Sequence, residues 1–392
     1  MIIKNALVFT LNRGFVKEDV FIKDNVFTSK INYMKETALP QDNLENKPSN
    51  SIDVIDGEGC YLIPGLVDVH FHGCIGYDFS DGEQESLKKI GKYEVENGIT
   101  SICPATMTLP VDKLEKICKN AYEYSKNNDK NLSRLCGIHL EGPFISKEKK
   151  GAQNPEFITN PDIKTVERLY EESGGLVKLI TIAPELQGSI EFIKNLSDKI
   201  HISVGHTNSD YQTASKAFKL GADHVTHMYN AMPCLLHRES GVIGAAFDNP
   251  HVMTEIICDG IHIQDTVIRM TFSMFGKERI ILVSDSMMAT GMNDGEYELG
   301  GQKVFVKGKL ATLKDGVIAG SATNLMDCMK KAVSMGISLE DSVRCASYNP
   351  AKSIGLDSII GSIEKGKLAD CVLLSISDLS IKKVILNGKI VD

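Results

Sequence analysis

The segment PGLVDVHFHG, residues 64–73, places two imidazoles two residues apart at the end of an apolar, β-branched run. Side chains two apart on a strand share a face, so His70 and His72 can reach one metal ion together while Phe71 packs the other way. Gly73 then lets the backbone turn. Paired histidines also occur as hydrogen-bonded structural residues, so the prediction of a metal site depends on the segments downstream.

Downstream of this segment, strand-like stretches alternate with helical ones. Strands are expected over residues 66–71, 100–105, 135–140, 178–183, 199–205, 224–229, 253–258 and 279–284. Helices are expected over residues 83–97, 111–127, 162–172, 209–220, 264–275 and 324–335, the last after a β-like excursion over 296–318. Eight strands with crossovers predict an α/β fold, a parallel (β/α)8 TIM barrel with its site at the carboxyl ends of the strands. The alternative is an open doubly wound sheet, but the glycine-rich dinucleotide and phosphate-binding motifs do not occur in the sequence.

Both ends of the chain predict short strands. Residues 1–63 alternate apolar and polar positions without a helical period and contain a polar stretch over 35–50, which is expected to be a loop. Near the other end, 368–376 and 381–390 have the pattern of strands, the second with an Asn387-Gly388 turn. The expected domains are a small β-sandwich made of residues 1–63 and 357–392, and a catalytic barrel over 64–356.

The overall charge argues against two classes of partner. The 392 residues include 43 Lys and Arg against 51 Asp and Glu, a formal charge of -8, which disfavours a nucleic-acid surface or an anionic membrane. The ten cysteines contain no C-x-x-C pair, and they are expected to be reduced thiols in a cytoplasmic protein. The first residues show no signal-peptide pattern, and the chain has no apolar run of 18 residues.

The ends of the expected strands carry most of the chemically active side chains. These residues are His70 and His72 (first strand), Glu141 (third), His206 (fifth), His227 (sixth), Asp259 and His262 (seventh), and Asp285 (eighth). Imidazole with carboxylate suits a borderline divalent ion such as zinc or ferrous iron, whereas magnesium and calcium prefer oxygen ligands. Structural or surface roles are expected for the other histidines, namely His139, His201, His224, His237 and His251. In a regular strand, His201 would face away from His206, and His224 from His227.

The order of seven motifs resembles one known family. The motifs PGLVDVHFHG, HLEGPF, GHTNS, THMYNAM, DGIH, SDS and AGSAT closely resemble those of the N-acetylglucosamine-6-phosphate deacetylase family of the amidohydrolase superfamily. The resemblance covers essentially the whole chain, and HLEGPF with THMYNAM and DGIH is its most specific part. It implies hydrolytic deacetylation of N-acetyl-D-glucosamine 6-phosphate to D-glucosamine 6-phosphate and acetate, in amino-sugar catabolism and cell-wall amino-sugar recycling, by a cytoplasmic homodimer.

The resemblance also implies a role for individual residues. Glu141, His206 and His227 would hold one divalent ion, and Glu141 would bridge to a second ion held by His70 and His72, with zinc and iron both possible. The ion would supply the attacking water. Asp285 would be the catalytic acid/base, and His262 would polarise the carbonyl. The implied substrate contacts are Ala152 and Gln153 in the loop that begins at Gly151, then Asn230, Ala231, Arg238, His262, and the backbone of Ile318, Ala319 and Gly320.

Two of these substrate contacts leave a question open. Gln153 stands where some relatives have His, so its contact with the sugar is undecided. Arg238 suits a phosphate because the guanidinium offers a planar fork of donors, and it could serve its own subunit or the neighbouring one.

Alternative functions remain at this point. The galactosamine epimer of the substrate shares every motif. Dihydroorotase-like and urease-like enzymes usually centre on a carboxylated lysine of the fourth strand; here Lys178 opens that strand and Glu141 takes the bridging place. A non-catalytic sugar-phosphate sensor on the same barrel would lack a ligand or the acid, and the sequence retains all of them. If Asp285 is not the acid/base, Asp259 is the next candidate.

Overall fold

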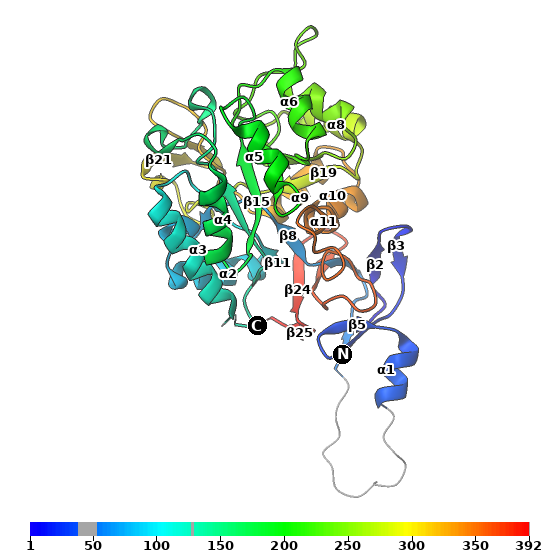
Figure 1. Cartoon of the computed structure of the whole chain (residues 1–392). Helices are drawn as coiled ribbons and strands as arrows, with labels where there is room; N and C mark the ends of the chain where they lie inside the picture. Colours follow the sequence, from blue (N-terminus) through cyan, green and yellow to red (C-terminus); the bar gives the residue numbers. More distant parts are fainter. Residues whose placement is uncertain (38–52, 127–128, 392) are drawn as a thin grey trace, which may run out of the picture.

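The computed structural model describes residues 1–37, 53–126 and 129–391 (Figure 1). Its central feature is a curled parallel sheet of seven strands in the order β12-β14-β15-β16-β17-β18-β19. The strands are β12 (Ala105–Thr106), β14 (Ile138–Glu141), β15 (Val177–Ile182), β16 (His201–Val204), β17 (His224–Val225), β18 (Met253–Ile257) and β19 (Ile280–Val283). A three-stranded parallel sheet, β13-β11-β8, adds β8 (Leu66–Asp68), β11 (Ile99–Ile102) and β13 (Arg134–Leu135). All eight expected strands are therefore present.

Hydrogen bonds connect the first and last of these strands beyond their regular ends. The Asp285 N–H donates to the His70 carbonyl at 2.9 Å, and the His72 N–H donates to the Ser286 carbonyl at 2.7 Å. Ser284 Oγ donates to Asp68 Oδ2 at 2.5 Å. The segment after β19 thus lies directly against the segment after β8, and both carry predicted site residues.

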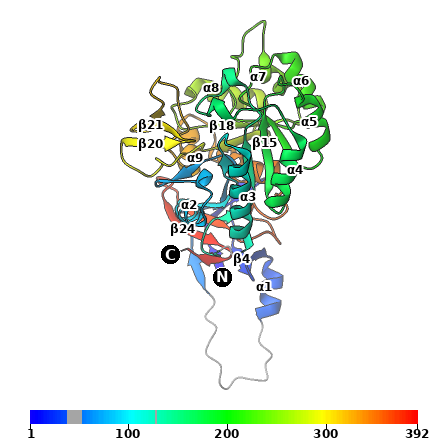
Figure 2. The ribbon, with the colours of Figure 1, turned by 60° about the vertical axis from the view of Figure 1, so that its left-hand side comes forward.

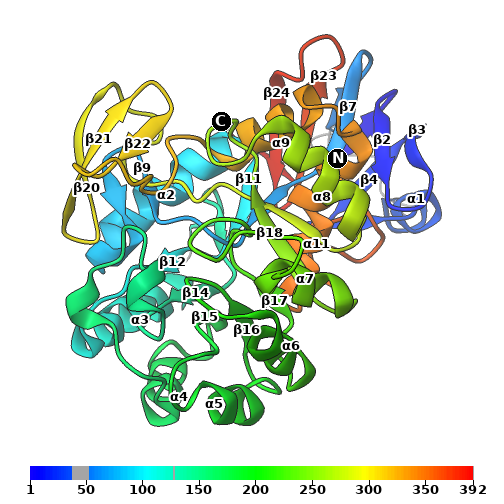
Figure 3. The same cartoon turned by 90° about the horizontal axis from the view of Figure 1, so that it is seen from above.

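The strands are buried on both faces, as the sequence pattern requires. Every residue of β18 and β19 is buried; β19 (IILV) is entirely apolar, whereas β18 (MTEII) includes Thr254 and Glu255. The helices lie outside the strands when the molecule is seen from above (Figure 3). They are α2 (Gln84–Glu96), α3 (Val111–Lys126), α4 (Ile163–Glu172), α5 (Ser189–Leu196), α6 (Tyr211–Lys219), α7 (Gly241–Asp248), α8 (Asp265–Phe275), α9 (Leu325–Ser334), α10 (Leu339–Ala346) and α11 (Tyr348–Ser353). Several begin at a side-chain cap, such as Asp162 before α4 and Asn324 before α9. Among the described residues, no helix is long and apolar enough to cross a membrane.

Strands from both chain ends share one sheet. The six-stranded sheet has the order β25-β24-β23-β7-β2-β3, with β2 (Leu7–Thr10), β3 (Gly14–Lys17), β7 (Cys60–Pro64), β23 (Cys371–Ser375), β24 (Ile381–Leu386) and β25 (Lys389–Ile390). A four-stranded sheet has the order β5-β4-β1-β6, with β1 (Ile2–Lys4), β4 (Val20–Lys23), β5 (Val26–Thr28) and β6 (Val54–Asp56). The expected Asn387-Gly388 turn joins β24 to β25 with positive φ at both residues, as a tight hairpin needs.

One prediction for the N-terminal region is wrong, and another lies outside the described residues. Residues 1–63 were expected to lack a helix, but α1 (Lys30–Thr37) lies in this region (Figure 2). Tyr33 of α1 packs its ring 5.5 Å from that of Phe21, in a small buried cluster with Ile2. The loop expected over 35–50 falls mostly on residues 38–52, which are not described.

The β-like excursion after the last barrel strand forms a separate small sheet. It consists of β20 (Gly295–Leu299), β21 (Gln302–Lys307) and β22 (Leu310–Thr312), paired antiparallel. Gln302 Nε2 donates to the Ala152 carbonyl, so this sheet contacts the loop after β14. Seen from above, the sheet lies at the rim of the molecule beside β9 (Gly73–Cys74) and α2 (Figure 3).

Candidate active site

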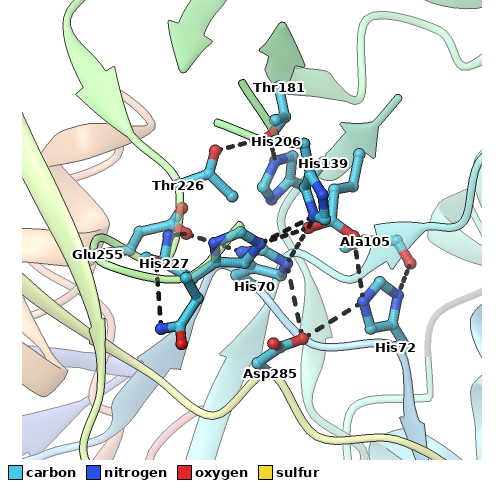
Figure 4. A network of polar contacts seen from close by, with 12 residues as sticks. His70, His72, Ala105, His139, Thr181, His206, Thr226, His227, Glu255 and Asp285 are labelled. Atoms are coloured by element: carbon cyan, nitrogen blue, oxygen red, sulfur yellow. Dashed lines mark hydrogen bonds and ion pairs between the residues drawn. The ribbon is translucent and has the colours of Figure 1, made fainter. Parts of the chain in front are cut away.

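Four histidines surround the carboxylate of Glu141. Figure 4 shows these four side chains, His70, His72, His206 and His227, gathered together. Glu141 Oε1 lies 3.2 Å from His70 Nε2, 3.1 Å from His206 Nε2 and 3.1 Å from His227 Nε2. The second oxygen, Oε2, lies 3.3 Å from His72 Nε2. All five residues are at most 5% exposed. Two possible ligand sets share Glu141, one with His70 and His72 and the other with His206 and His227.

The other nitrogen of three of these rings is already engaged. His72 Nδ1 donates to the Ala105 carbonyl at 3.2 Å, and His206 Nδ1 donates to the Lys149 carbonyl at 2.8 Å. His70 Nδ1 donates to Glu255 Oε2 at 2.7 Å. A ring whose Nδ1 carries the proton presents the Nε2 lone pair, which is the arrangement that metal-binding histidines adopt.

The arrangement fits a cation between the rings. His206 Nε2 and His227 Nε2 are 3.0 Å apart, and His70 Nε2 has no hydrogen bond to any described residue. Burial alone would lower the pKa of His72, but its contacts with Asp285 and Glu141 raise that pKa to about 10. The carboxylates therefore make this buried pocket favourable for positive charge. A donor set of imidazole and carboxylate suits a divalent metal.

The predicted site residues after three barrel strands adopt left-handed backbone conformations. The φ angle is 44° at His206, 29° at His227 and 49° at Asp285, and Ala231 has 52°. Such angles cost energy for residues with a side chain and occur most often at functional sites. They turn each side chain out of the strand direction and into the space above the sheet.

Asp285 lies at the edge of the histidine group. Its Oδ1 is 3.4 Å from His72 Nε2 and 3.8 Å from His70 Nε2, and the residue is 7% exposed. Burial alone would raise the pKa of Asp285, but the contacts with His72 and His70 lower it overall. The carboxylate is therefore ionised at neutral pH and can accept a proton.

His262 is held by Asp259, three residues before it. His262 Nδ1 donates to Asp259 Oδ2 at 2.7 Å, and Asp259 Oδ1 accepts the backbone N–H groups of Ile261 and His262 at 2.8 and 2.9 Å. Burial opposes the charged form, but the bond to Asp259 raises the pKa of His262. Nε2 of His262 is left available, and His262 lines the same cavity as Asp285.

A cavity of about 520 Å³ opens above these side chains. Its lining includes most of the predicted substrate residues, namely Ala152, Gln153, Asn230, Ala231, His262, Ile318 and Gly320. Ala319 is fully buried and does not line it. Three further lysines, Lys147, Lys149 and Lys150, line the cavity and were not predicted.

Arg238 lies away from this cavity. It is exposed and lines a different surface hollow of about 670 Å³, together with Tyr211 and Glu239. The loop before α7 that carries Arg238 projects from the top of the molecule in Figures 1 and 2. Within one subunit, Arg238 and the histidine group are therefore separate.

Gln153 is committed to contacts within the protein. Its Oε1 accepts the Thr108 N–H at 2.7 Å, and its Nε2 donates to Glu141 Oε2 at 2.6 Å. The residue is only 2% exposed. The backbone donor fixes the orientation of the amide, so its NH2 group must face Glu141.

The remaining histidines mostly fit the structural roles expected of them, with one correction. His139 Nε2 lies 2.7 Å from Thr181 Oγ1, and burial lowers the pKa of His139 to about 3. His201 lies away from the site, and its Nδ1 is 2.6 Å from Asp223 Oδ2. His224, however, lies near the site: its Nε2 is 3.2 Å from Glu255 Oε1. The parity argument assumed a regular strand, and it does not apply because β17 ends at Val225, before His227.

Sequence reasoning missed Glu255. It lies within β18, is fully buried, and contacts His70. The available signal was a single acidic residue inside the strand-like segment MTEII. A buried carboxylate in such a strand requires partners, because burying an unpaired charge is costly.

Comparison with known proteins agrees with this geometry. The sequence model of the amidohydrolase family matches residues 61–391. N-acetylglucosamine-6-phosphate deacetylase of Bacillus subtilis (strain 168) is 36% identical over 400 residues, covering 100% of this chain and 96% of the relative. N-acetylgalactosamine-6-phosphate deacetylase of Escherichia coli O157:H7 is 30% identical over 341 residues, covering 86% of this chain and 90% of the relative.

Solved structures give the same result. A mutant N-acetyl-D-glucosamine-6-phosphate deacetylase from Mycobacterium smegmatis, in complex with N-acetyl-D-glucosamine-6-phosphate, superimposes with a TM-score of 0.89 at 28% identity and covers 100% of this chain and 99% of that chain. N-acetylglucosamine-6-phosphate deacetylase from Thermotoga maritima gives a TM-score of 0.86 at 31% identity, covering 100% and 99%. This chain therefore belongs to the amidohydrolase family, within the group that contains the N-acetylglucosamine-6-phosphate deacetylases.

Proposed function

We propose that this chain hydrolyses N-acetyl-D-glucosamine 6-phosphate to D-glucosamine 6-phosphate and acetate, in amino-sugar catabolism and cell-wall amino-sugar recycling. The observation that carries the proposal is the convergence of four imidazole Nε2 atoms on Glu141, with Asp285 beside them at one cavity. The names of the relatives from Bacillus subtilis and Thermotoga maritima support the substrate.

The donor set supports one or two divalent ions, and zinc and iron both suit it. Glu141, His206 and His227 would hold one ion, and Glu141 with His70 and His72 would hold the other. A bound divalent ion would polarise the acetamide carbonyl and make water a stronger nucleophile. The two carbonyls and the carboxylate that accept hydrogen bonds from Nδ1 of His70, His72 and His206 would hold these three rings in place.

Asp285 would move the proton in this reaction. Its ionised carboxylate would accept a proton from the attacking water and then deliver it to the departing amine. His262 would assist at the carbonyl oxygen, because its Nδ1 is held by Asp259 and its Nε2 remains free for a hydrogen bond. These roles need both residues at one cavity, which they share.

The remaining substrate contacts are proposed from the cavity lining. Ala152, Asn230, Ala231 and the backbone of residues 318–320 would contact the sugar. Gln153 would act on the sugar indirectly, since both ends of its amide are already bonded.

Arg238 would serve the phosphate of a neighbouring subunit in a homodimer. It lies outside its own cavity, and Leu235 and Leu236 on the same loop are 43% and 56% exposed. A partner subunit would cover these apolar side chains.

We also infer the finer architecture. The eight parallel strands would form a closed (β/α)8 barrel domain over residues 64–356, supported by the hydrogen bonds between the segments after β8 and β19. Residues 1–63 and 357–392 would form one small β-sandwich domain, supported by their shared sheet. A cytoplasmic location is proposed because all ten cysteines are free thiols.

One alternative has specific support. The Escherichia coli relative is named for the galactosamine epimer, so N-acetylgalactosamine-6-phosphate remains a candidate substrate. A non-catalytic sugar-phosphate sensor is disfavoured, because the ligand set and the acid are all retained.

Acetate release distinguishes these functions. Protein purified without chelator is analysed for metal and then assayed with both epimers, each with and without the 6-phosphate. The expected result is fastest release from the phosphorylated glucosamine derivative, with loss on chelation and recovery on addition of zinc or iron. Absence of acetate release from every substrate by metal-loaded protein would contradict the proposal.

A further inference from the structure

Glu255 is a fully buried carboxylate that the proposed reaction does not use directly. It lies in the middle of strand β18, to one side of the histidine group and next to His227 in Figure 4. Its Oε2 accepts two hydrogen bonds, from His70 Nδ1 at 2.7 Å and from the backbone N–H of His227 at 3.1 Å. Its Oε1 lies 3.2 Å from His224 Nε2. One side chain therefore contacts residues of both possible metal sets.

The two contacts act in different ways. The bond to His70 fixes which ring nitrogen carries the proton and keeps Nε2 directed at Glu141. The bond to His227 holds the backbone at a residue with φ of 29°, where the chain leaves the regular strand. The other oxygen lies 3.2 Å from His224 Nε2, so rotation of the carboxylate away from His70 would also disrupt this contact.

We propose that Glu255 is a positioning residue that links the two metal positions, by orienting His70 in one and holding the backbone of His227 in the other. This inference rests on the proposed metal-dependent function. The contact with His70 is charge-assisted and at the ring itself, whereas the contact with His227 is through the backbone. Loss of Glu255 therefore affects the His70 and His72 position more strongly than the His206 and His227 position.

Metal affinity of the purified protein tests this inference. Wild type and Glu255→Gln are loaded with zinc, dialysed against a graded series of chelator concentrations, and analysed for zinc equivalents and for Tm. Gln keeps an acceptor for His70 but removes the charge. The more weakly bound zinc, at His70 and His72, should therefore dissociate at a free zinc concentration roughly 10- to 100-fold higher than in wild type. The affinity for the more tightly bound zinc, at His206 and His227, should change less.

A matched control separates positioning from a general effect of burial. Glu94 in α2 is also a buried carboxyl group, but it lies beside Asp68 and Cys74, and among the described residues no hydrogen bond or ion pair joins it to the four histidines. Glu94→Gln should leave both zinc affinities at the wild-type value, even if Tm changes. His224→Gln should give a smaller shift than Glu255→Gln, because the bond to His70 remains.

The outcomes are distinguishable. If Glu255→Gln folds and binds both zinc equivalents as wild type does, or if Glu94→Gln gives the same shift, the positioning role is wrong. If Glu255→Gln does not fold, Glu255→Asp keeps the charge but shortens the arm, and it must show the same selective loss. If wild type binds no metal at all, the proposed function fails instead.

Discussion

Changing Asp285 to Asn tests the proposed proton transfer most directly. Asp285 is 7% exposed, and its Oδ1 lies 3.4 Å from His72 Nε2. Asn has the same shape and still offers an oxygen to His72, but it cannot carry the proton. A positioned acid/base is worth ~10² to 10⁴ in rate, which corresponds to about 3 to 5 kcal/mol in activation free energy. We expect kcat to fall by that range while metal content and Tm stay close to wild type.

Acetate release, metal analysis and thermal unfolding are measured on the same preparations. An N-trifluoroacetyl analogue has a carbonyl that is attacked more easily, so it should recover part of the lost rate. Full recovery is not expected, because the amine must still be protonated. Near-normal turnover by Asp285→Asn, or loss of turnover only because metal is lost, would refute the assignment and make Asp259 the next candidate.

Three further predictions follow from the site. Arg238→Ala should lower kcat/KM for the phosphorylated sugar roughly 10- to 100-fold, since a charge-assisted hydrogen bond contributes about 1.5 to 3 kcal/mol. An equal loss of kcat/KM with the unphosphorylated sugar would rule out the phosphate role. His206→Ala or His227→Ala should abolish activity and binding of the more tightly held metal ion, whereas changing both His70 and His72 to Gln should lower metal content and leave partial activity. If wild type binds one equivalent of metal and the His70 and His72 double variant binds the same amount, two ions are excluded. Gln153→Ala should lower the free energy of unfolding by about 1 to 3 kcal/mol, because it leaves the buried Thr108 N–H without its partner; urea unfolding at the wild-type value would show that water replaces the amide.

The strands of the sheet were predictable because of their burial. Parallel strands covered on both faces must be apolar throughout, and β19 (sequence IILV) shows this pattern clearly. Helices with a strong apolar stripe, such as α3, were also found. The pattern did not reveal α7 (sequence GVIGAAFD), which is apolar around its circumference and contains two glycines, nor the short helix α5. Tertiary contacts decide whether such segments are helical.

The predicted metal ligands meet because the carboxyl ends of parallel strands lie on one face. Their hydrogen-bonding partners could not be predicted in the same way. Glu255 and His70 are 185 positions apart, and Gln153 reaches the Thr108 N–H across 45 positions. Such contacts depend on register and on side-chain rotamers, which no local pattern encodes.

The sequence alone does not distinguish the roles of the four carboxylates near the site, Glu141, Glu255, Asp259 and Asp285. In the structure, their roles differ according to which histidine ring nitrogen each one faces. Glu255 and Asp259 accept hydrogen bonds from Nδ1 atoms, so they orient His70 and His262 and have little freedom to exchange protons. Glu141 faces Nε2 atoms on both of its oxygens, which is the position of a shared metal ligand. Asp285 also faces Nε2 atoms, but from the cavity side at 3.4 Å and more. Asp285 therefore lies beside the proposed metal without already bridging its ligands and without a bond to an Nδ1 donor, whereas Asp259 is bonded to Nδ1 of His262, and these positions favour Asp285 over Asp259 for the proposed acid/base role.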